Sequence, residues 1–258
     1  MKNIKIIFFD IDGTLIDLQR KAITDTMLST LIRLKQKGYL LCLATGRGPS
    51  SLPHFPGVAF DAFLTFNGSY CFTPEADIYS NPLPDTDVET LLRNAARLGR
   101  PVSIATADRY AANGADADLI QYYAFAGKEI EIPEDFDRLV HKPIYQVMLG
   151  CRKADHPLLL AGTRNAKITF WWDRAVDIIP ADGGKGTGIR KILDHFSLTP
   201  DNALAFGDGS NDIEMLQAVG TAVAMGNASE NVKAHADEVC LPVSQEGITH
   251  YCTTHGLL

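Results

Sequence analysis

Residues 8–14 read Phe8-Phe9-Asp10-Ile11-Asp12-Gly13-Thr14, and this stretch decides the predicted fold. A run of apolar residues begins at Ile4 and stops at two carboxylates, Asp10 and Asp12, two positions apart. The run is too apolar to alternate, which is typical of a central parallel strand that is covered on both faces. Ligands of such sheets bind just past the carboxyl ends of the strands. We therefore expect both carboxylates to lie in a functional site, although Asp12-Gly13 alone is also a turn signal.

The length of 258 residues predicts one large domain or two modest ones. The hydrophobic fraction of 46% and the charged fraction of 21% are typical of a globular chain with a sizeable core. The net charge of −7, without a basic tract, argues against a nucleic-acid partner. The five cysteines lack CxxC spacing and are typical of core thiols in a reducing compartment. The sequence contains no apolar stretch long enough to cross a bilayer, so we predict a cytoplasmic protein without membrane contact.

Strand and helix patterns alternate at both ends of the chain. Apolar residues at helical spacing follow Thr24, which we expect to cap the helix, and Gly38 ends it. The expected buried strands span residues 39–44, 62–66, 203–206, 221–225 and 238–241. Several of them end in Asp, Thr or Asn followed by a turn, which predicts a polar rim along one edge of a sheet. The alternation predicts an α/β fold with a parallel sheet.

The pattern changes between about Leu83 and Gly184. Helical patterns at 88–98 and 117–126 mix with strand-like patterns at 102–107, 145–149, 167–172 and 176–179. Prolines are denser near the start of this region, as expected at a domain boundary. We therefore predict an α+β domain, residues 83–182, inserted into a core formed by residues 1–82 and 183–258.

Four carboxylates would meet at the polar rim if the strands that carry them are neighbours: Asp10, Asp12, Asp208 and Asp212. Crowded like charges repel and raise one another's pKa values, and a divalent cation relieves this repulsion. All-oxygen ligation suits Mg²⁺, which favours sites shared with phosphate. Taken singly, Asp208 also fits a glycine-flanked turn, and Asp212 fits a charge in the first turn of a helix. The four together predict a magnesium site.

A phosphate group needs hydrogen-bond donors, and two stretches supply them. Thr45 offers a hydroxyl, and Gly46 and Arg47 offer backbone N–H groups where a strand ends. Lys185 stands among glycines at positions 183, 184, 186 and 188, which predicts a mobile ammonium group. These glycines do not form a Walker phosphate loop, because that motif has Ser or Thr directly after the lysine. The Arg47 side chain fits a substrate contact or a solvated surface charge equally well.

Four motifs of the haloacid-dehalogenase-like (HAD) superfamily have counterparts in the same order: Asp10-Ile-Asp-Gly-Thr14, Thr45-Gly-Arg47, Lys185 and Gly207-Asp208-Gly-Ser-Asn211-Asp212. The chain most resembles the Cof-type branch with a type IIB cap, which is rich in sugar-phosphate phosphatases. Further matches are Asn67-Gly68, Gly226-Asn227-Ala228 with Lys233, and Glu246-Gly247-Ile248. The resemblance covers residues 1–72 and 183–250, whereas the cap matches only by position and approximate strand content. It implies a Rossmann-like parallel-sheet core whose inserted α+β cap determines substrate specificity.

The resemblance also assigns roles to the site residues. It implies that Asp10 attacks phosphorus, giving an aspartyl-phosphate, and that Asp12 protonates the leaving alcohol and then deprotonates water. Magnesium would bind Asp10, the backbone carbonyl of Asp12, and Asp208. Thr45 and Lys185 would contact the phosphoryl group, and Gly46 and Arg47 would contact the substrate. Asn211 would orient either Lys185 or the phosphate. Asp212 would contact the metal directly or indirectly.

These expectations describe a magnesium-dependent phosphatase of small phosphate monoesters such as sugar phosphates, acting as a monomer or homodimer. A HAD phosphomutase, which also carries Asp-x-Asp, stays open as an alternative. So does a non-catalytic binding protein on the same fold, although the intact motifs argue against it. Asp12 disfavours the transport ATPases of the superfamily, which have Thr at that position. Within the cap, strand alternation sends Trp171 and Trp172 to opposite faces. Either both pack in the cap or lie on its surface, or one of them lines the entrance to the site.

Overall fold

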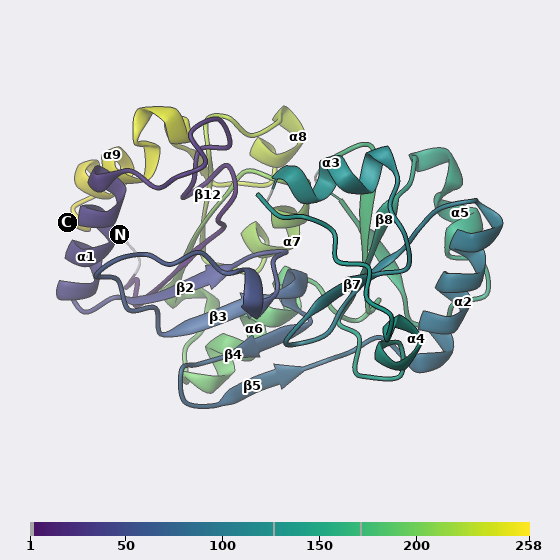
Figure 1. Ribbon diagram of the computed structural model, residues 1–258. Helices are drawn as coiled ribbons and strands as arrows, with labels where there is room; N and C mark the ends of the chain where they lie inside the picture. Colours follow the sequence, from purple (N-terminus) through teal and green to yellow (C-terminus); the bar gives the residue numbers. More distant parts are fainter. Residues whose placement is uncertain (1–2, 126, 171) are drawn as a thin grey trace. The chain divides into compact units, whose positions relative to one another are not determined.

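The structure is a computed structural model that describes residues 3–125, 127–170 and 172–258 (Figure 1). Contacts between backbone positions divide the chain into two compact units. The core unit comprises the described residues of 1–47, 52–79 and 185–258, and the cap unit comprises 48–51 and the described residues of 80–184.

The core unit is built on one sheet with the strand order β13-β12-β11-β1-β2-β3-β4-β5. The strands are β1 (Ile6–Phe9), β2 (Leu40–Ala44), β3 (Ala62–Thr65), β4 (Tyr70–Phe72), β5 (Asp77–Ser80), β11 (Ala203–Gly207), β12 (Thr221–Ala224) and β13 (Glu238–Val239). β1 lies at the centre and runs parallel to both neighbours, with Phe9 opposite Phe206 of β11 and Leu43 of β2. The predicted α/β fold with a parallel core sheet is confirmed. The sheet is nevertheless mixed, because β4 pairs with β3 in the antiparallel direction.

Helices cover both faces of this sheet (Figure 1). They are α1 (Asp25–Gln36), α6 (Lys185–His195), α7 (Ile213–Leu216), α8 (Glu230–Lys233) and α9 (Gly247–Thr254). Alternate residues of β1 enter different apolar clusters: Ile7 and Phe9 pack with α1 and α9, whereas Ile6 and Phe8 pack with α6 and α7. Burial on both faces explains why the first strand shows no polar alternation.

The first helix begins and ends as its sequence predicts. The Thr24 hydroxyl accepts the N–H of Met27 at 3.1 Å, which is the expected N-cap. Gly38 follows the helix with a φ of 90°, a left-handed conformation that favours glycine.

The cap unit contains an antiparallel sheet in the order β7-β6-β8-β10-β9. Its strands are β6 (Ser103–Ala105), β7 (Tyr110–Ala112), β8 (Gln146–Gly150), β9 (Lys167–Thr169) and β10 (Ala175–Ile179). Its helices are α2 (Asp85–Arg97), α3 (Ala117–Phe125), α4 (Phe136–Leu139) and α5 (His156–Leu159). Trp172 packs against Phe125 with ring centroids 5.1 Å apart, whereas Trp171 lies outside the described residues.

Six short 3-10 turns complete the described elements. They are η1 (Pro49–Ser51), η2 (Phe66–Gly68), η3 (Lys153–Asp155), η4 (Pro200–Asn202), η5 (Ser210–Asp212) and η6 (Val243–Gln245). Two of them lie at the polar rim of the core sheet, because η2 follows strand β3 directly and η5 begins three positions after the last residue of β11.

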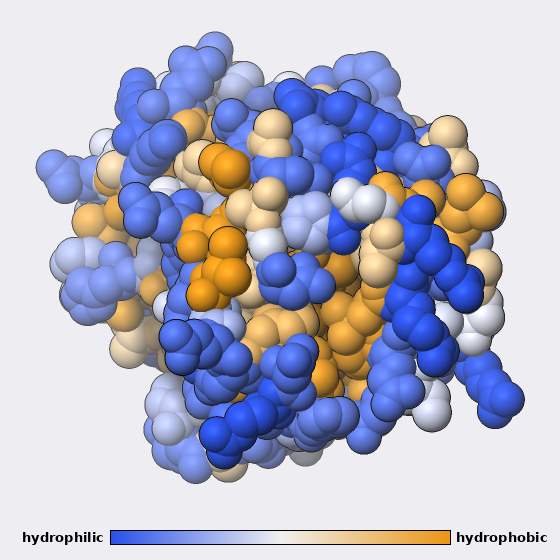
Figure 2. Space-filling model, turned by 45° about the vertical axis from the view of Figure 1, so that its right-hand side comes forward, coloured by the Kyte–Doolittle hydropathy of each residue, from blue (hydrophilic) through white to orange (hydrophobic). Residues whose placement is uncertain are grey.

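Hydrophilic residues cover most of the face shown in Figure 2, with smaller apolar patches among them. The large apolar side chains that are exposed include Ile120, Ile132 and Leu158 of the cap unit and Val239 of the core unit. Among the described residues, no helix combines the length and apolar character needed to span a membrane.

Candidate active site

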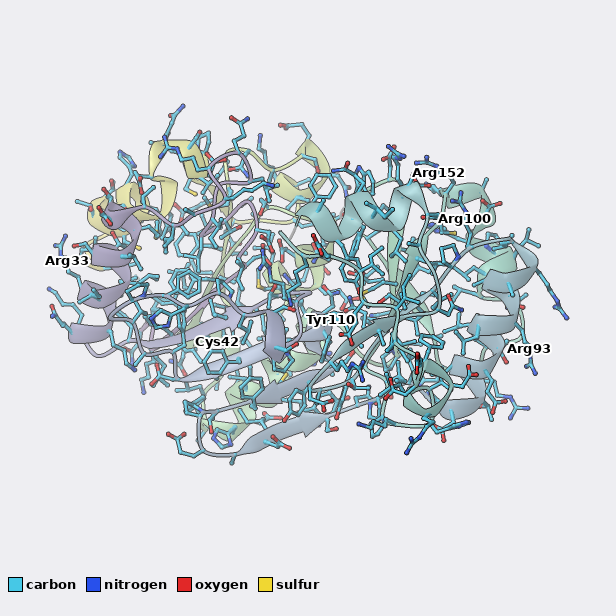
Figure 3. All side chains as sticks on the ribbon, viewed as in Figure 1. Arg33, Cys42, Arg93, Arg100, Tyr110 and Arg152 are labelled. Carbon is cyan, nitrogen blue, oxygen red and sulfur yellow. The ribbon has the colours of Figure 1, made fainter. Side chains whose placement is uncertain are left out.

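The register of the core sheet brings three predicted site residues to one edge. Asp10 follows β1, Thr45 follows β2 and Asp208 follows β11, and these three strands are adjacent and parallel. The backbone N–H of Asp10 donates to the carbonyl of Phe206 at 3.1 Å, which extends the ladder to the site itself. Cys42, labelled in Figure 3, marks the position of β2 three residues before Thr45. The carboxyl ends of the strands therefore form the polar rim.

Lys185 lies between two carboxylates. Its Nζ donates to Asp10 Oδ1 at 2.6 Å and also to Asp212 Oδ1. The Lys185 and Asp212 side chains are both 0% exposed, so this ion-pair cluster is shielded from solvent. Burial by itself would lower the pKa of Lys185, but the neighbouring Asp10 and Asp212 carboxylates raise that pKa above its ordinary value. Lys185 therefore carries its positive charge in this site.

The glycines around Lys185 allow close packing, and the prediction of a mobile ammonium group is wrong. A β-carbon on Gly186 would lie 2.7 Å from the backbone oxygen of Glu214. A β-carbon on Gly188 would lie 2.6 Å from Leu64 Cδ1. Helix α6 can thus approach α7 and β3 closely, which carries Lys185 at its start into the buried cluster.

Asp212 holds the loop that carries Asp208. Its Oδ2 accepts the backbone N–H groups of Asp208 and Gly209, at 3.0 and 2.8 Å. Because its Oδ1 accepts from Lys185, this one carboxylate ties α6 to the end of β11.

Asp208 packs directly against the turn after β1. Its Oδ1 accepts the hydroxyl of Thr14 at 2.8 Å, and its Oδ2 accepts the Asn227 amide at 3.3 Å. A β-carbon on Gly13 would lie 2.2 Å from Asp208 Oδ2, and Gly13 has a φ of +89°. Both the space and the backbone conformation therefore require glycine at this position.

Asp12 and Arg47 form a forked ion pair. The Nε of Arg47 donates to Asp12 Oδ2 at 2.8 Å, and one terminal nitrogen donates to Oδ1 at 2.6 Å. The Arg47 backbone N–H donates to the Thr45 hydroxyl at 3.1 Å, which connects the pair to the end of β2. Of the two interpretations of Arg47, the structure disfavours a solvated surface charge, because the side chain is only 17% exposed and is held by Asp12.

Asn211 contacts Asn67, which disfavours one of its two expected roles, the orientation of Lys185, and leaves orientation of the phosphate as a prediction. The Asn211 amide donates to Asn67 Oδ1 at 3.0 Å, whereas Lys185 is held by carboxylates. Asn67 is buried and has a φ of 53°, a conformation that Asn tolerates better than most residues. A β-carbon on Gly46 would lie 3.1 Å from the Asn67 amide nitrogen, so Gly46 also borders this residue.

Three residues with defined contacts here had no predicted role: Thr14, Asn67 and Asn227. Asn67 and Asn227 each stand beside a glycine at a strand end, and this was the feature of the sequence that could have indicated a role in the site. A local pattern gives no indication of which distant group such an amide will contact.

The acidic cluster can hold a divalent cation. Oxygen atoms of Asp10, Asp208 and Asp212 lie within 4.8 Å of one another. Burial raises the pKa of Asp10 well above its ordinary value, and Asp212 adds to the rise while Lys185 opposes it. Burial and Asp212 likewise raise the pKa of Asp208 to about 7. When all three carboxylates are ionised, they leave two negative charges against the one ammonium, and hard oxygen ligands suit Mg²⁺.

The family model for haloacid dehalogenase-like hydrolases matches residues 7–251. The chain belongs to this family. It is 32% identical over 256 residues to the Bacillus subtilis (strain 168) protein named "Putative phosphatase YkrA", covering 98% of each chain. It is 28% identical over 258 residues to the HMP-PP phosphatase of Citrobacter koseri, covering 95% of this chain and 93% of that protein.

Solved structures agree with this assignment. A HAD subclass IIB sugar phosphatase matches with a TM-score of 0.90 and 28% identity, covering 98% of this chain and 100% of that one. A Geobacillus kaustophilus protein described as hypothetical matches with a TM-score of 0.86 and 35% identity, covering 99% and 100%. The predicted superfamily, its subclass IIB fold and the assignment as a phosphatase are confirmed.

Proposed function

We propose that this HAD phosphatase is magnesium-dependent and hydrolyses small phosphate monoesters through an aspartyl-phosphate on Asp10. The observation that carries the proposal is the buried cluster in which Lys185 contacts Asp10 and Asp212 beside Asp208. Such a cluster supplies a nucleophile, a fixed positive charge and a set of oxygen ligands at one sheet edge.

Asp10, Asp208 and the backbone carbonyl of Asp12 would hold the magnesium ion. Bound there, the ion supplies positive charge that keeps the carboxylates ionised and attracts the phosphoryl oxygens. Asp212 belongs to the same acidic cluster, but its oxygens accept hydrogen bonds from Lys185 and from two backbone N–H groups. We therefore assign it the indirect role of positioning Lys185 and Asp208.

In the first step the Asp10 carboxylate oxygen bonds to phosphorus while the ester P–O bond breaks. The forked pair of Asp12 with Arg47 must first open, and Asp12 must take up a proton from solvent. Asp12 then gives this proton to the leaving oxygen. Lys185 and Thr45 donate to the phosphoryl oxygens as their charge changes. The Thr45 hydroxyl accepts from the Arg47 N–H and still has its own proton to donate.

In the second step Asp12, now a carboxylate, takes a proton from water as that water attacks phosphorus. The Asp10–phosphorus bond breaks, which releases inorganic phosphate and regenerates the Asp10 carboxylate. Gly46, Arg47 and Asn211 border the same edge, and we assign them to substrate contacts. The Arg47 guanidinium suits an anion because it presents several donors in one plane.

Sugar phosphates are the substrate class that we favour, and the inserted cap, residues 83–182, is the region that we expect to select among them. The similarity to a solved subclass IIB sugar phosphatase supports this class, whereas the HMP-PP phosphatases are relatives with another named activity. The test is a phosphate-release screen with Mg²⁺ over sugar phosphates, pyridoxal phosphate, flavin mononucleotide and nucleotides. Release from none of these classes would contradict the proposal.

Hydrolysis in oxygen-18 water separates this mechanism from its alternatives. Under single-turnover conditions we expect the label in the released phosphate and an unlabelled Asp10, because water attacks phosphorus. Label in the Asp10 carboxylate would mean attack on the acyl carbon and would refute the role of Asp12. Transfer of phosphate to a second hydroxyl without release would identify a phosphomutase.

The cellular context stays a prediction. The five cysteines are free thiols, four of them buried, which fits the expected reducing cytoplasm. A small phosphorylated metabolite is the expected partner, with no nucleic acid or membrane, and the protein is expected to be a monomer or homodimer.

A further inference from the structure

Asn227 follows β12, and its side-chain amide contacts three separate segments. The Nδ2 group donates to the backbone carbonyl of Gly13 at 2.9 Å and to Asp208 Oδ2 at 3.3 Å. The Oδ1 atom accepts the backbone N–H of Val243 at 2.9 Å. A backbone N–H can only donate, so Val243 fixes which end of the amide is the oxygen, and Nδ2 faces two acceptors.

Close packing on both sides of Asn227 makes these contacts possible. A β-carbon on Gly226 would lie 2.7 Å from the backbone nitrogen of Pro242, so Gly226 lets the chain after β12 approach the start of η6. On the other side, Gly13 lies directly against Asp208, and a side chain there would separate the two. One amide can therefore reach the turn after β1, the end of β11 and the backbone before α9.

We propose that Asn227 is a positioning residue for Asp208 in the magnesium site. Thr14 donates to Asp208 Oδ1 and Asn227 donates to Oδ2, so each oxygen of this carboxylate has one fixed donor. An ionised carboxylate has about four lone-pair sites, so two remain for a cation. Fixing the carboxylate before the ion binds reduces the ordering cost of binding.

The contact with Gly13 extends this role to the turn that carries Asp12. The same Nδ2 group bonds the Gly13 carbonyl, next to the Asp12 carbonyl that we assign to the metal. The inference rests on the proposed function, because it concerns the ligand set for Mg²⁺.

Isothermal titration of metal-free protein with MgCl₂ tests the proposal directly, and does not depend on turnover. For Asn227→Ala we expect Mg²⁺ affinity to fall about ten-fold or more, which is the usual effect of removing a group that orients a metal ligand. Kinetically, the apparent KM for Mg²⁺ should rise by a similar factor, while kcat at saturating Mg²⁺ changes little.

Val243→Pro is a second variant that leaves Asn227 in place. It removes the N–H that orients the amide, at the first residue of η6, where proline is well tolerated. Pro242 has φ −58° and ψ 157°, a conformation that suits the residue before a proline. We expect a smaller loss of Mg²⁺ affinity in the same direction, and this variant carries the test if Asn227→Ala does not fold.

Asn202→Ala is the matched control. Asn202 also uses its amide to join segments, donating to the Asn3 carbonyl at 3.0 Å and accepting from Thr199. Asn202 directly precedes β11, whereas Asp208 directly follows it, so the two residues lie at opposite ends of that strand. We expect it to lower thermal stability and to leave Mg²⁺ affinity unchanged.

Each outcome decides the proposal. Wild-type Mg²⁺ affinity in both Asn227→Ala and Val243→Pro, with reduced thermal stability, would show a purely structural role and overturn the inference. A loss of Mg²⁺ affinity in Asn202→Ala as large as in Asn227→Ala would overturn it as well. Absence of Mg²⁺ binding to the wild type would refute the proposed function itself, and the inference with it.

Discussion

Replacing Lys185 by methionine removes a buried positive charge while keeping a side chain of similar length. The wild-type ammonium contacts Asp10 Oδ1 at 2.6 Å and Asp212 Oδ1, and it is 0% exposed. In the variant these two carboxylates face each other across an apolar group without a counter-charge. Removing one partner of a buried ion pair costs about 3–5 kcal/mol. For a chain of this size, that corresponds to a decrease in Tm of about 6–20 °C.

The loss of stability caused by Lys185→Met should depend on pH, and the direction of this dependence follows from the pKa of Asp10. Burial, followed by Asp212, already raises the pKa of Asp10, whereas Lys185 opposes the rise, so removing Lys185 raises that pKa further. Between the folded pKa of Asp10 in the wild type and its higher folded pKa in the variant, the variant's native state keeps a proton that the wild type has lost, so the variant's stability falls more steeply as pH rises. The loss of stability in Lys185→Met should therefore be larger at pH 8 than at pH 5.

The assay is thermal unfolding of the metal-free protein at both pH values, followed by circular dichroism. Lys191→Met is the control, because Lys191 lies on the same helix and is exposed, beside the Tyr79 ring. That exposed contact is worth about 1 kcal/mol or less. We also expect phosphate release by Lys185→Met to fall about 10²–10³-fold. An equal loss of stability at pH 5 and pH 8 would refute the electrostatic reasoning and indicate lost packing instead.

Three further predictions concern the other groups of the site. Asp10→Asn should abolish phosphate release with an unchanged circular dichroism spectrum, because the amide keeps the volume and loses the nucleophile; near-wild-type release would refute the mechanism. Arg47→Lys should lower kcat/KM about ten-fold in steady-state assays, because an ammonium cannot present several donors in one plane to the substrate phosphoryl group; an unchanged value would exclude Arg47 from substrate contact. Chelation should remove activity and Mg²⁺ should restore it; full activity after chelation would contradict this. The Mg²⁺ affinity measured by titration should rise from pH 5 to pH 7, because burial raises the pKa of Asp208 to about 7 and a metal ligand must lose its proton.

The sequence by itself determined the parallel part of the core sheet and the residues at the ends of its strands. The first strand is apolar throughout because both of its faces are buried, and Asp10 therefore marks the strand end without reference to the rest of the chain. The same local logic located Thr45 and Asp208. Residues at equivalent ends of parallel strands meet at one edge, so their proximity followed from the pattern.

Only the tertiary structure decided what these side chains contact. The pairs Lys185–Asp10, Arg47–Asp12 and Asn227–Asp208 join segments whose separation along the chain carries no periodic signal. The burial of Lys185 depends on how closely α6 packs against α7 and β3. The glycines permit this close packing, but their presence in the sequence does not predict it. Short strands such as β7 (Tyr110–Ala112) escaped prediction because three residues are too few for a periodic pattern. Hydrophobic pattern is a property of one segment, whereas hydrogen bonds and ion pairs depend on two segments brought together by packing.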